Sequence, residues 1–165
     1  MYKRQESLLS EPASNSRVQP VKGKTYYIKN VDSQLFMDVS RNSKSNGGNI
    51  HQWSFHGGDN QKFRIENFSG NARIISVSSG KSLDIENRST SNGGNLQQWN
   101  SSSNAQNQKF TILGVPGNNR RFFIENLNSN KLLGIAGSSK SRGANIEQNV
   151  RNDASTRQWA FYLAN

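Results

Sequence analysis

The chain contains no cysteine and no long apolar run among its 165 residues. Without cysteine, a disulfide framework and thiolate chemistry are excluded, so packing and backbone hydrogen bonds must supply the stability. No stretch approaches the roughly 18 apolar residues of a membrane-spanning helix, so we expect a soluble protein without membrane insertion. The first residues carry charge but no apolar segment behind them, which argues against a conventional secretory signal. Export by another route, followed by action outside the cell, and excision from a longer chain both stay open.

Apolar residues are also scarce, at 32% of the chain. Such a composition suits either a disordered chain or a small core under many polar turns, and the periodic aromatic and β-branched residues favour the second. At this length we expect one domain with one modest core. Residues 1–23 are polar, lack periodicity and contain Pro12 and Pro20, which predicts a flexible tail or linker. The folded domain is therefore expected to span residues 24–165.

The formal net charge is +10, from 21 Lys and Arg residues against 11 Asp and Glu residues. The basic residues are scattered over turns and strand ends, and Lys3-Arg4 and Arg120-Arg121 are the only adjacent pairs. This distribution favours a solvated basic surface over a dedicated nucleic-acid site. The charge should still bias the protein toward sulfated or sialylated partners at low salt.

Three related segments organise the sequence. The segment from Asp84 to Phe110 nearly copies Asp38 to Phe63, and a weaker copy runs from Gly134 to Trp159. The offset between copies is 46 residues and then 50, so each unit is a supersecondary module that buries its apolar face against its neighbours. We place the repeats at about residues 24–69, 70–118 and 119–165.

Each repeat shows four strand signals. A short apolar run is followed by a turn, a second apolar run, a loop of Ser, Asn and Gly, a third run with apolar-polar alternation and a fourth run of the same kind. In repeat one these runs include residues 26–28, 35–39, 50–53 and 63–65. No segment has helical periodicity. We therefore predict an all-β fold of about twelve strands, closed with pseudo-threefold symmetry so that few edges stay exposed.

Two residue types recur at positions that the fold alone does not explain. Asp38 and Asp84 lie inside apolar strands, which is an unusual place for a turn residue. Trp53 and Trp99 share a register position at which the third repeat has Asn149, so an exposed platform is favoured over a core position. Trp159, in contrast, takes the place of Phe63 and Phe110 and is expected in the core.

The third repeat has lost the Asp, the Trp and a Gln together. It has Gly134, Asn149 and Arg157 at these positions, and none of the three preserves charge or ring. If the original residues only packed the fold, apolar replacements would be expected. We therefore predict that repeats one and two are competent for binding and that repeat three is structural.

These residues resemble the ricin B-type lectins, whose fold is a β-trefoil of three four-stranded repeats. The repeated Gln-x-Trp signature of that family is found here as Gln61-Lys62-Phe63, Gln108-Lys109-Phe110 and Arg157-Gln158-Trp159, so each copy departs from it at one position. The Asp, the Asn-Gly-Gly loop and the upstream Trp stand in register with it. The resemblance runs from about Lys24 to Asn165, and the cysteine-free form is similar to the bacterial branch.

The resemblance implies a sugar site in each of the first two repeats, and the chemistry of the residues agrees with it. A pyranose needs a flat apolar platform and a few fixed hydrogen-bonding groups. Tryptophan supplies the platform, a carboxylate accepts from two hydroxyls, Asn offers an amide, and Gln orients the carboxylate from behind, as its family counterparts do. The expected carbohydrate-binding residues are Asp38, His51, Trp53, Asn60 and Gln61 in repeat one and Asp84, Gln97, Trp99, Asn107 and Gln108 in repeat two.

The two expected sites differ at one position, because His51 stands in the place of Gln97. An imidazole gains charge as the pH falls, so the first site is expected to respond to acid more than the second. A plain surface histidine is an equal alternative. Catalysis is not expected, because no second carboxylate is placed to partner Asp38 or Asp84. The spacing of His51 and His56 does not favour a metal site, and no cofactor is expected.

The expected function is therefore carbohydrate binding without catalysis. By resemblance, galactose or N-acetylgalactosamine termini are the first expected ligands, on glycoproteins, glycolipids or polysaccharide. The polar tail suggests association with a larger toxin or hydrolase. Two alternatives stay open: a protein-binding or inhibitory scaffold, since a fold does not fix function, and a binder of sulfated or other anionic polysaccharide through the basic surface.

Overall fold

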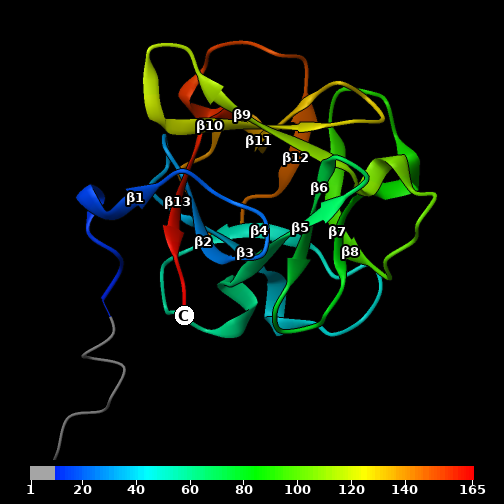
Figure 1. The fold of residues 1–165 in the computed structure, drawn as a ribbon, viewed down its shortest axis with the longest axis horizontal. Helices are drawn as coiled ribbons and strands as arrows, with labels where there is room; N and C mark the ends of the chain where they lie inside the picture. Colours follow the sequence, from blue (N-terminus) through cyan, green and yellow to red (C-terminus); the bar gives the residue numbers. More distant parts are fainter. Residues whose placement is uncertain (1–9) are drawn as a thin grey trace, which may run out of the picture.

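The computed structural model describes residues 10–165, and its strands follow the threefold repeat (Figure 1). Repeat one contributes β2 (Thr25–Asn30), β3 (Phe36–Val39), β4 (Ile50–Trp53) and β5 (Phe63–Phe68). Repeat two contributes β6 (Asn71–Ser76), β7 (Ser82–Ile85), β8 (Gly94–Trp99) and β9 (Phe110–Val115). Repeat three contributes β10 (Asn118–Asn126), β11 (Leu132–Ile135), β12 (Ile146–Asn149) and β13 (Trp159–Leu163). The predicted all-β fold is confirmed, with its twelve repeat strands at the expected places.

Short 3-10 turns punctuate the strands, and there is no α-helix among residues 10–165. Each second strand ends in such a turn, and so does each loop before a fourth strand. The turns are η2 (Ser14–Ser16), η3 (Ser40–Asn42), η4 (Asp59–Gln61), η5 (Glu86–Arg88), η6 (Gln106–Gln108), η7 (Ala136–Ser138) and η8 (Ser155–Arg157). The part of the chain that the structure describes holds no helix long and apolar enough to cross a membrane.

The first and fourth strands of the three repeats form a closed barrel. Antiparallel pairs join β2 to β5, β5 to β6, β6 to β9, β9 to β10, β10 to β13 and β13 back to β2. Closure leaves none of these six strands with an open edge along its whole length, which is the usual solution for a sheet built from hairpins. The predicted closed β-trefoil is therefore the fold of this chain.

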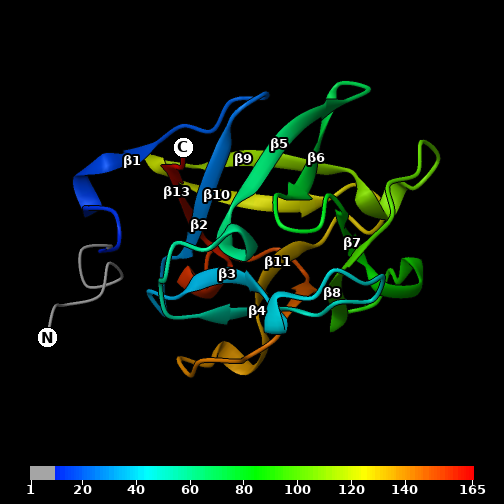
Figure 2. The ribbon, with the colours of Figure 1, turned by 90° about the horizontal axis from the view of Figure 1, so that it is seen from below.

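The second and third strands form three hairpins at one end of the barrel: β3–β4, β7–β8 and β11–β12. In Figure 2 the β3–β4 hairpin lies below the barrel strands β2 and β5. The hairpins meet one another through the pairing of β8 with β12 and through isolated bridges from Asn49 to Gln97 and from His51 to Asn145. Because each hairpin touches its neighbours, a loop of one repeat lies beside the hairpin of another.

Aromatic side chains fill the centre of the barrel. Trp159, Phe63 and Phe110 are fully buried, and the indole Nε1 of Trp159 donates to the carbonyl of Leu133 at 3.0 Å. The prediction that Trp159 is a core residue, equivalent to the two phenylalanines, is confirmed. A buried indole needs a hydrogen-bond acceptor, and the backbone of β11 provides it.

Three buried glutamines tie the hairpins together across repeat boundaries. Gln52, Gln98 and Gln148 stand at equivalent positions and have no exposed surface. The amide of Gln52 donates to the carbonyls of Ser139 at 3.0 Å and Ser141 at 2.8 Å in repeat three. The other two glutamines repeat this arrangement on the carbonyls of Ser43 and Ser45, and of Ser89 and Ser91. Side-chain hydrogen bonds thus join neighbouring repeats, and the amides of these buried glutamines all have hydrogen-bond partners.

A short strand precedes the expected start of the domain. Strand β1 (Arg17–Val18) pairs with Tyr162 and Phe161 of β13, beside which it lies in Figure 1. The prediction of a tail over residues 1–23 thus differs from the structure at these two residues, which belong to the sheet. Two residues are too few to show strand periodicity in a sequence. The first nine residues of the expected tail lie outside the described residues.

Candidate functional site

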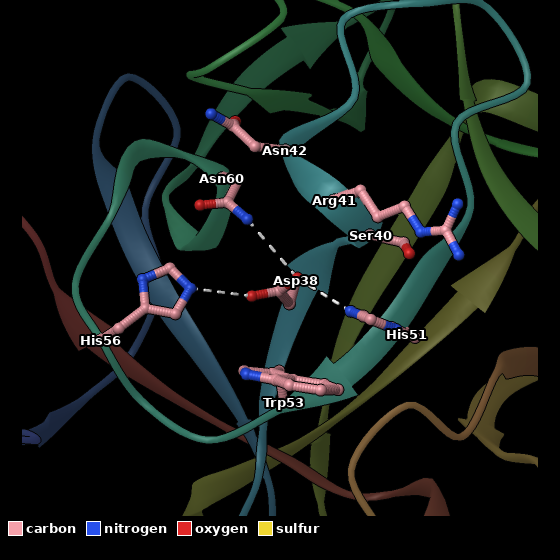
Figure 3. A pocket seen from close by; sticks show the side chains of 8 residues that line it. All are labelled: Asp38, Ser40, Arg41, Asn42, His51, Trp53, His56 and Asn60. Atoms are coloured by element: carbon pink, nitrogen blue, oxygen red, sulfur yellow. Dashed lines mark hydrogen bonds and ion pairs between the residues drawn. The ribbon is translucent and has the colours of Figure 1, made fainter.

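A buried carboxylate in repeat one gathers hydrogen-bond donors from three segments. Asp38 lies on β3, opposite His51 of β4 in the hairpin register, and only 3% of it is exposed. The Nε2 atom of His51 lies 2.9 Å from Oδ1 of Asp38. A buried carboxylate is tolerated where donors satisfy its oxygens, and Figure 3 shows these side chains converging on Asp38.

Gln61 fixes both the carboxylate and the loop above it. Its Nε2 donates to Oδ2 of Asp38 and to the carbonyl of Ser54, both at 2.9 Å. Its Oε1 accepts from the backbone N–H groups of His56 at 2.9 Å and Gly57 at 3.1 Å. Gln61 is fully buried, so this one side chain holds the acid and the loop in a fixed relation. The expected orienting contact between Gln61 and Asp38 is present in the structure.

His56 joins this cluster and was not among the predicted site residues. Its Nε2 lies 3.1 Å from Oδ2 of Asp38, on the side opposite His51 (Figure 3). Its loop has no periodicity and no counterpart histidine in repeat two, so no sequence pattern indicated this position. Asn60 also reaches the cluster, with its Nδ2 3.1 Å from the carbonyl oxygen of Val39 and 3.5 Å from Oδ1 of Asp38.

The two tryptophans lie at the surface beside the buried acids. Trp53 is 37% exposed and Trp99 is 44% exposed, so the prediction of exposed rings at this register position is confirmed. The ring of Trp53 stacks on that of His51, with ring centroids 5.3 Å apart and an interplanar angle of 15°. In repeat one a broad apolar face therefore adjoins a hydrogen-bonding group, and in repeat two Trp99 lines the same cavity as Gln97.

Repeat two builds the same arrangement with different neighbours. Gln97 donates to Oδ1 of Asp84 at 3.0 Å, and Gln108 donates to Oδ2 at 2.9 Å. Asn107 donates to the carbonyl of Ile85 at 2.9 Å, and its own Oδ1 is buried without a partner among the described residues. A buried polar atom without a partner is costly, so Asn107 is held in place at some expense of stability.

Burial raises the pKa of the Asp84 carboxyl above its ordinary value of 3.8. Hydrogen bonds from Gln108 and Gln97 and the charge of Arg88 act in the opposite direction but do not outweigh the loss of solvation. Burial thus disfavours the ionised form of Asp84 relative to that of an exposed aspartate.

Each acid lies at the base of a cavity. The first cavity has a volume of about 620 Å³ and is lined by Asp38, Ser40, Arg41, Asn42, His51, Trp53, His56 and Asn60. The second cavity has a volume of about 380 Å³ and is lined by Asp84, Asn87, Arg88, Gln97, Trp99, Ser102, Ala105, Asn107 and Gln108. The predicted residues of each repeat are thus brought together, although Gln61 lies behind the first cavity wall.

The residues of η3 and η5 complete the cavity walls and were also missed by sequence reasoning. Arg41 and Asn42 have φ values of 57° and 51°, and Asn87 and Arg88 have values of 56° and 54°. Two consecutive left-handed residues turn the chain sharply after β3 and β7 and direct side chains along the cavity. Left-handed backbone is uncommon outside glycine, and no local sequence pattern predicts it at these residues.

Repeat three lacks this arrangement. Gly134 stands opposite Glu147 in the hairpin register, where repeats one and two have an acid opposite His51 or Gln97. A Cβ atom at Gly134 would lie 2.8 Å from Cγ of Arg157 and 3.0 Å from the carbonyl oxygen of Thr156. The space of the acid is therefore taken by Arg157, the residue that replaces Gln61.

No group of three or more His, Cys, Asp or Glu side chains within residues 10–165 has a geometry that could hold a metal ion. The imidazoles of His51 and His56 contact a shared aspartate through Nε2. They act in this structure as hydrogen-bonding groups around Asp38.

Comparison with known families agrees with the fold and with the repeats. The family model described as "Ricin-type beta-trefoil lectin domain-like" matches residues 16–99 and 106–165. The match covers most of the chain, including β1, which precedes the start expected from sequence. The chain belongs to this ricin B-type family of carbohydrate-binding lectin domains.

Individual relatives show how this fold occurs elsewhere. A designed threefold symmetric protein, ThreeFoil, is 32% identical, with a TM-score of 0.80, and the match covers 84% of this chain and 97% of the other. The exo-beta-1,3-galactanase 1,3Gal43A of Clostridium thermocellum is 25% identical, with a TM-score of 0.80, over 86% of this chain and 30% of the enzyme.

A curated relative matches over a shorter stretch. The clotting factor G alpha subunit of Tachypleus tridentatus is 38% identical over 50 residues, which is 30% of this chain. That stretch is only 7% of the length of the relative. The chain therefore spans a small part of the curated protein that it matches and less than a third of the galactanase.

Proposed function

We propose that this chain is a carbohydrate-binding module with two sites, the first cavity in repeat one and the second cavity in repeat two. The observation that carries the proposal is the pairing, in both cavities, of a buried and fixed carboxylate with an exposed tryptophan. A sugar presents a face of C–H groups and an edge of hydroxyls, and this pair complements both. Repeat three has neither member of the pair, which supports a structural role for it.

We infer that galactose or N-acetylgalactosamine termini are the first ligands to test. Support comes from the family to which the chain belongs and from its likeness to the trefoil part of a galactanase. In each site the aspartate would accept hydrogen bonds from two neighbouring hydroxyls, Asn60 or Asn107 would contact a third, and the indole would pack on the ring face. A shallow site of this kind binds on the order of millimolar, so useful avidity requires both sites or a multimeric host.

Binding rather than hydrolysis is proposed because Asp38 and Asp84 are each the single carboxylate among the residues that line their cavities. Glycoside hydrolysis by the common mechanisms uses two carboxylates across the scissile bond. The match with the galactanase covers 30% of that longer chain. By analogy, we propose that this module serves a larger hydrolase or toxin as its sugar-recognition part.

Titration calorimetry with lactose tests the two-site proposal. The native chain should bind two equivalents, Trp53→Ala and Trp99→Ala should each bind one, and the double variant should bind none. Val150→Ala is the matched control, because Val150 is an exposed apolar residue outside both cavities. Since both tryptophans are exposed, the variants should keep their folding stability, which circular dichroism can verify.

A glycan array at moderate and high salt widens the test to other ligands. Neutral sugars bound by the native chain and lost in the double tryptophan variant support the proposal. Binding of anionic polysaccharide that survives in the double variant and disappears at high salt would contradict it in favour of the basic surface. Absence of any glycan signal would favour the protein-binding scaffold.

A further inference from the structure

The two cavities differ in their basic residues although they share a framework. Each has one aspartate and one arginine on its wall, Arg41 in the first and Arg88 in the second, but the first cavity is also lined by His51 and His56. In the second cavity the positions of the two histidines are taken by the neutral Gln97 and Ser102. His56 and Ser102 occupy equivalent positions in the structure. The backbone N–H of His56 donates to Oε1 of Gln61 at 2.9 Å, and that of Ser102 donates to Oε1 of Gln108 at 3.0 Å.

The flanking residues increase this difference. Glu86, the first residue of η5, stands where η3 has the neutral Ser40. Glu86 does not line the second cavity, but it lies in the same turn as Arg88. The equivalent turn beside the first cavity has no acid, so the surroundings of the first cavity carry one negative charge fewer at this position.

Arg41 occupies a backbone position that does not favour an arginine. Its φ and ψ are 57° and 22°, and the equivalent residues are Asn87 and Gly137. Asn and Gly are the residues that adopt left-handed backbone most readily, whereas a long side chain is disfavoured there. Strained residues of this kind are concentrated at functional sites. In Figure 3 the side chain of Arg41 extends along the cavity wall on the side of His51.

A second arginine reaches the same cavity from repeat three. The guanidinium of Arg142 lies 5.3 Å from the ring centroid of Trp53, and a Cβ atom on the next residue, Gly143, would lie 3.7 Å from that indole. At the second cavity the equivalent loop of repeat one offers Asn46, whose side chain accepts from the backbone of Asn100 at 2.8 Å. Only the first cavity, among the described residues, has arginines both on its wall and over its tryptophan.

We propose that the first cavity binds a sugar that carries an anionic substituent, a carboxylate or a sulfate, and that Arg41 and Arg142 are the residues that select it. The inference rests on the proposed function and names the ligand class of one of its two sites. The sugar ring would pack on Trp53, and the substituent would lie between the two guanidinium groups. A guanidinium presents a planar fork of donors that fits carboxylate and sulfate oxygens. Both arginines are exposed, so their guanidinium groups are accessible to a ligand from solvent.

Asp38 does not oppose this arrangement. Its oxygens lie within hydrogen-bond distance of His51, His56 and Gln61, so the negative charge is shared with donors at the base of the cavity. The anionic group of the ligand would be held at the rim, by residues of η3 and of the loop that contains Arg142. Neutral hydroxyls and the charged substituent would thus be recognised at different depths.

The test isolates each site and compares three ligands. Trp99→Ala leaves the first site alone, and Trp53→Ala leaves the second. Each variant is titrated calorimetrically with lactose, sulfated lactose and sialylated lactose at about 0.1 M salt. In Trp99→Ala, at least one charged ligand should bind about tenfold more tightly than lactose, whereas Trp53→Ala should show no such preference. A gain for the sulfated ligand alone assigns sulfate, and a gain for the sialylated ligand alone assigns carboxylate.

Two substitutions test the arginines. Arg41→Asn and Arg142→Asn introduce the residue found at the equivalent position of another repeat, Asn87 or Asn46, so both backbones accept the change. Each should lower the ratio of charged to neutral affinity in Trp99→Ala, and together they should bring it close to one. Lys24→Gln removes a positive charge outside both cavities and should leave the ratio unchanged.

The results separate this inference from the proposed function. If Trp99→Ala binds lactose but binds neither charged ligand more tightly, the inference is overturned and the proposed function stands. A preference that survives the combined Arg41→Asn and Arg142→Asn variant also overturns it. If neither single-site variant binds any of the three ligands, the proposed function fails first.

Discussion

The Nε2 atom of His56 lies 3.1 Å from Oδ2 of Asp38. A side chain of the protein thus occupies a position from which a ligand hydroxyl would otherwise donate to this carboxylate. The second cavity has no histidine at this position, because Ser102 stands in the place of His56, and Asp84 accepts from Gln97, Gln108 and Asn107. Ligand binding to the first site therefore requires His56 to move aside or to share its acceptor.

This contact predicts that His56 weakens the first site. His56→Ser introduces the residue that stands at this position in the second cavity, so it frees Oδ2 of Asp38 for a ligand hydroxyl. Lactose affinity should rise several-fold when His56→Ser is added to Trp99→Ala, which retains the first site. The same substitution added to Trp53→Ala, which retains the second site, should leave lactose affinity unchanged. An equal effect in the two single-site variants would disprove the prediction.

A second prediction concerns the stability of the fold in acid. Burial raises the pKa of Asp84 above its unfolded value, so the folded chain binds this proton more tightly than the unfolded chain does. Stability from this group is therefore gained as the pH falls through the raised pKa toward 3.8, and is absent at neutral pH. The free energy of unfolding of the native chain should rise relative to that of Asp84→Asn across this interval. Urea denaturation at a series of pH values measures the difference, and an opposite slope would contradict the pKa shift.

The buried glutamines that join the repeats should contribute strongly to the stability of the fold, although glutamine is usually a surface residue. Gln52→Ala would remove its hydrogen bonds to the carbonyls of Ser139 and Ser141 and from the hydroxyl of Ser33, and it would open a cavity where the fully buried side chain lay. The three lost hydrogen bonds and the lost packing predict a loss of about 2–4 kcal/mol. Gln106→Ala is the matched control, because Gln106 is exposed, and it should cost less than about 0.5 kcal/mol. Chemical denaturation of both variants provides the comparison.

The glycines of the Asn-Gly-Gly loops predict a related effect. A Cβ atom on Gly48 would lie 2.6 Å from Nε2 of Gln98, and that amide is held by two carbonyls. Gly48→Ala should therefore destabilise the fold by about 1–3 kcal/mol, the usual range for overpacking. Gly114→Ala should be nearly neutral in the same denaturation assay, because no atom lies within 4 Å of the added Cβ. A neutral Gly48→Ala would mean that Gln98 can shift without loss.

The sequence was sufficient to predict the fold and the central residues of both cavities. Three copies in register showed which positions are shared, and the joint loss of Asp, Trp and Gln in the third copy drew attention to the residues that gather at the two cavities. Internal comparison of this kind also placed Trp159 in the core and Trp53 and Trp99 at the surface, as the structure confirms.

Residues without a counterpart could not be found in the same way. His56 and Arg41 have no equivalent of the same type in another repeat, and their places depend on loop geometry and on left-handed backbone that no local pattern encodes. Strand β1 was missed because its two residues derive their conformation from pairing with β13. These features depend on contacts between segments far apart in the chain, which periodicity does not report.

The hydrogen bonds from Gln52 make the hairpin of the first cavity depend on repeat three. The carbonyls of Ser139 and Ser141 in that repeat hold the amide of Gln52, and Gly143 lies against the indole of Trp53. Gln98 and Gln148 close the same ring of contacts through the other repeats. Removal of any one repeat would therefore take away support from a hairpin of its neighbour, so we expect the three repeats to unfold together as one cooperative unit.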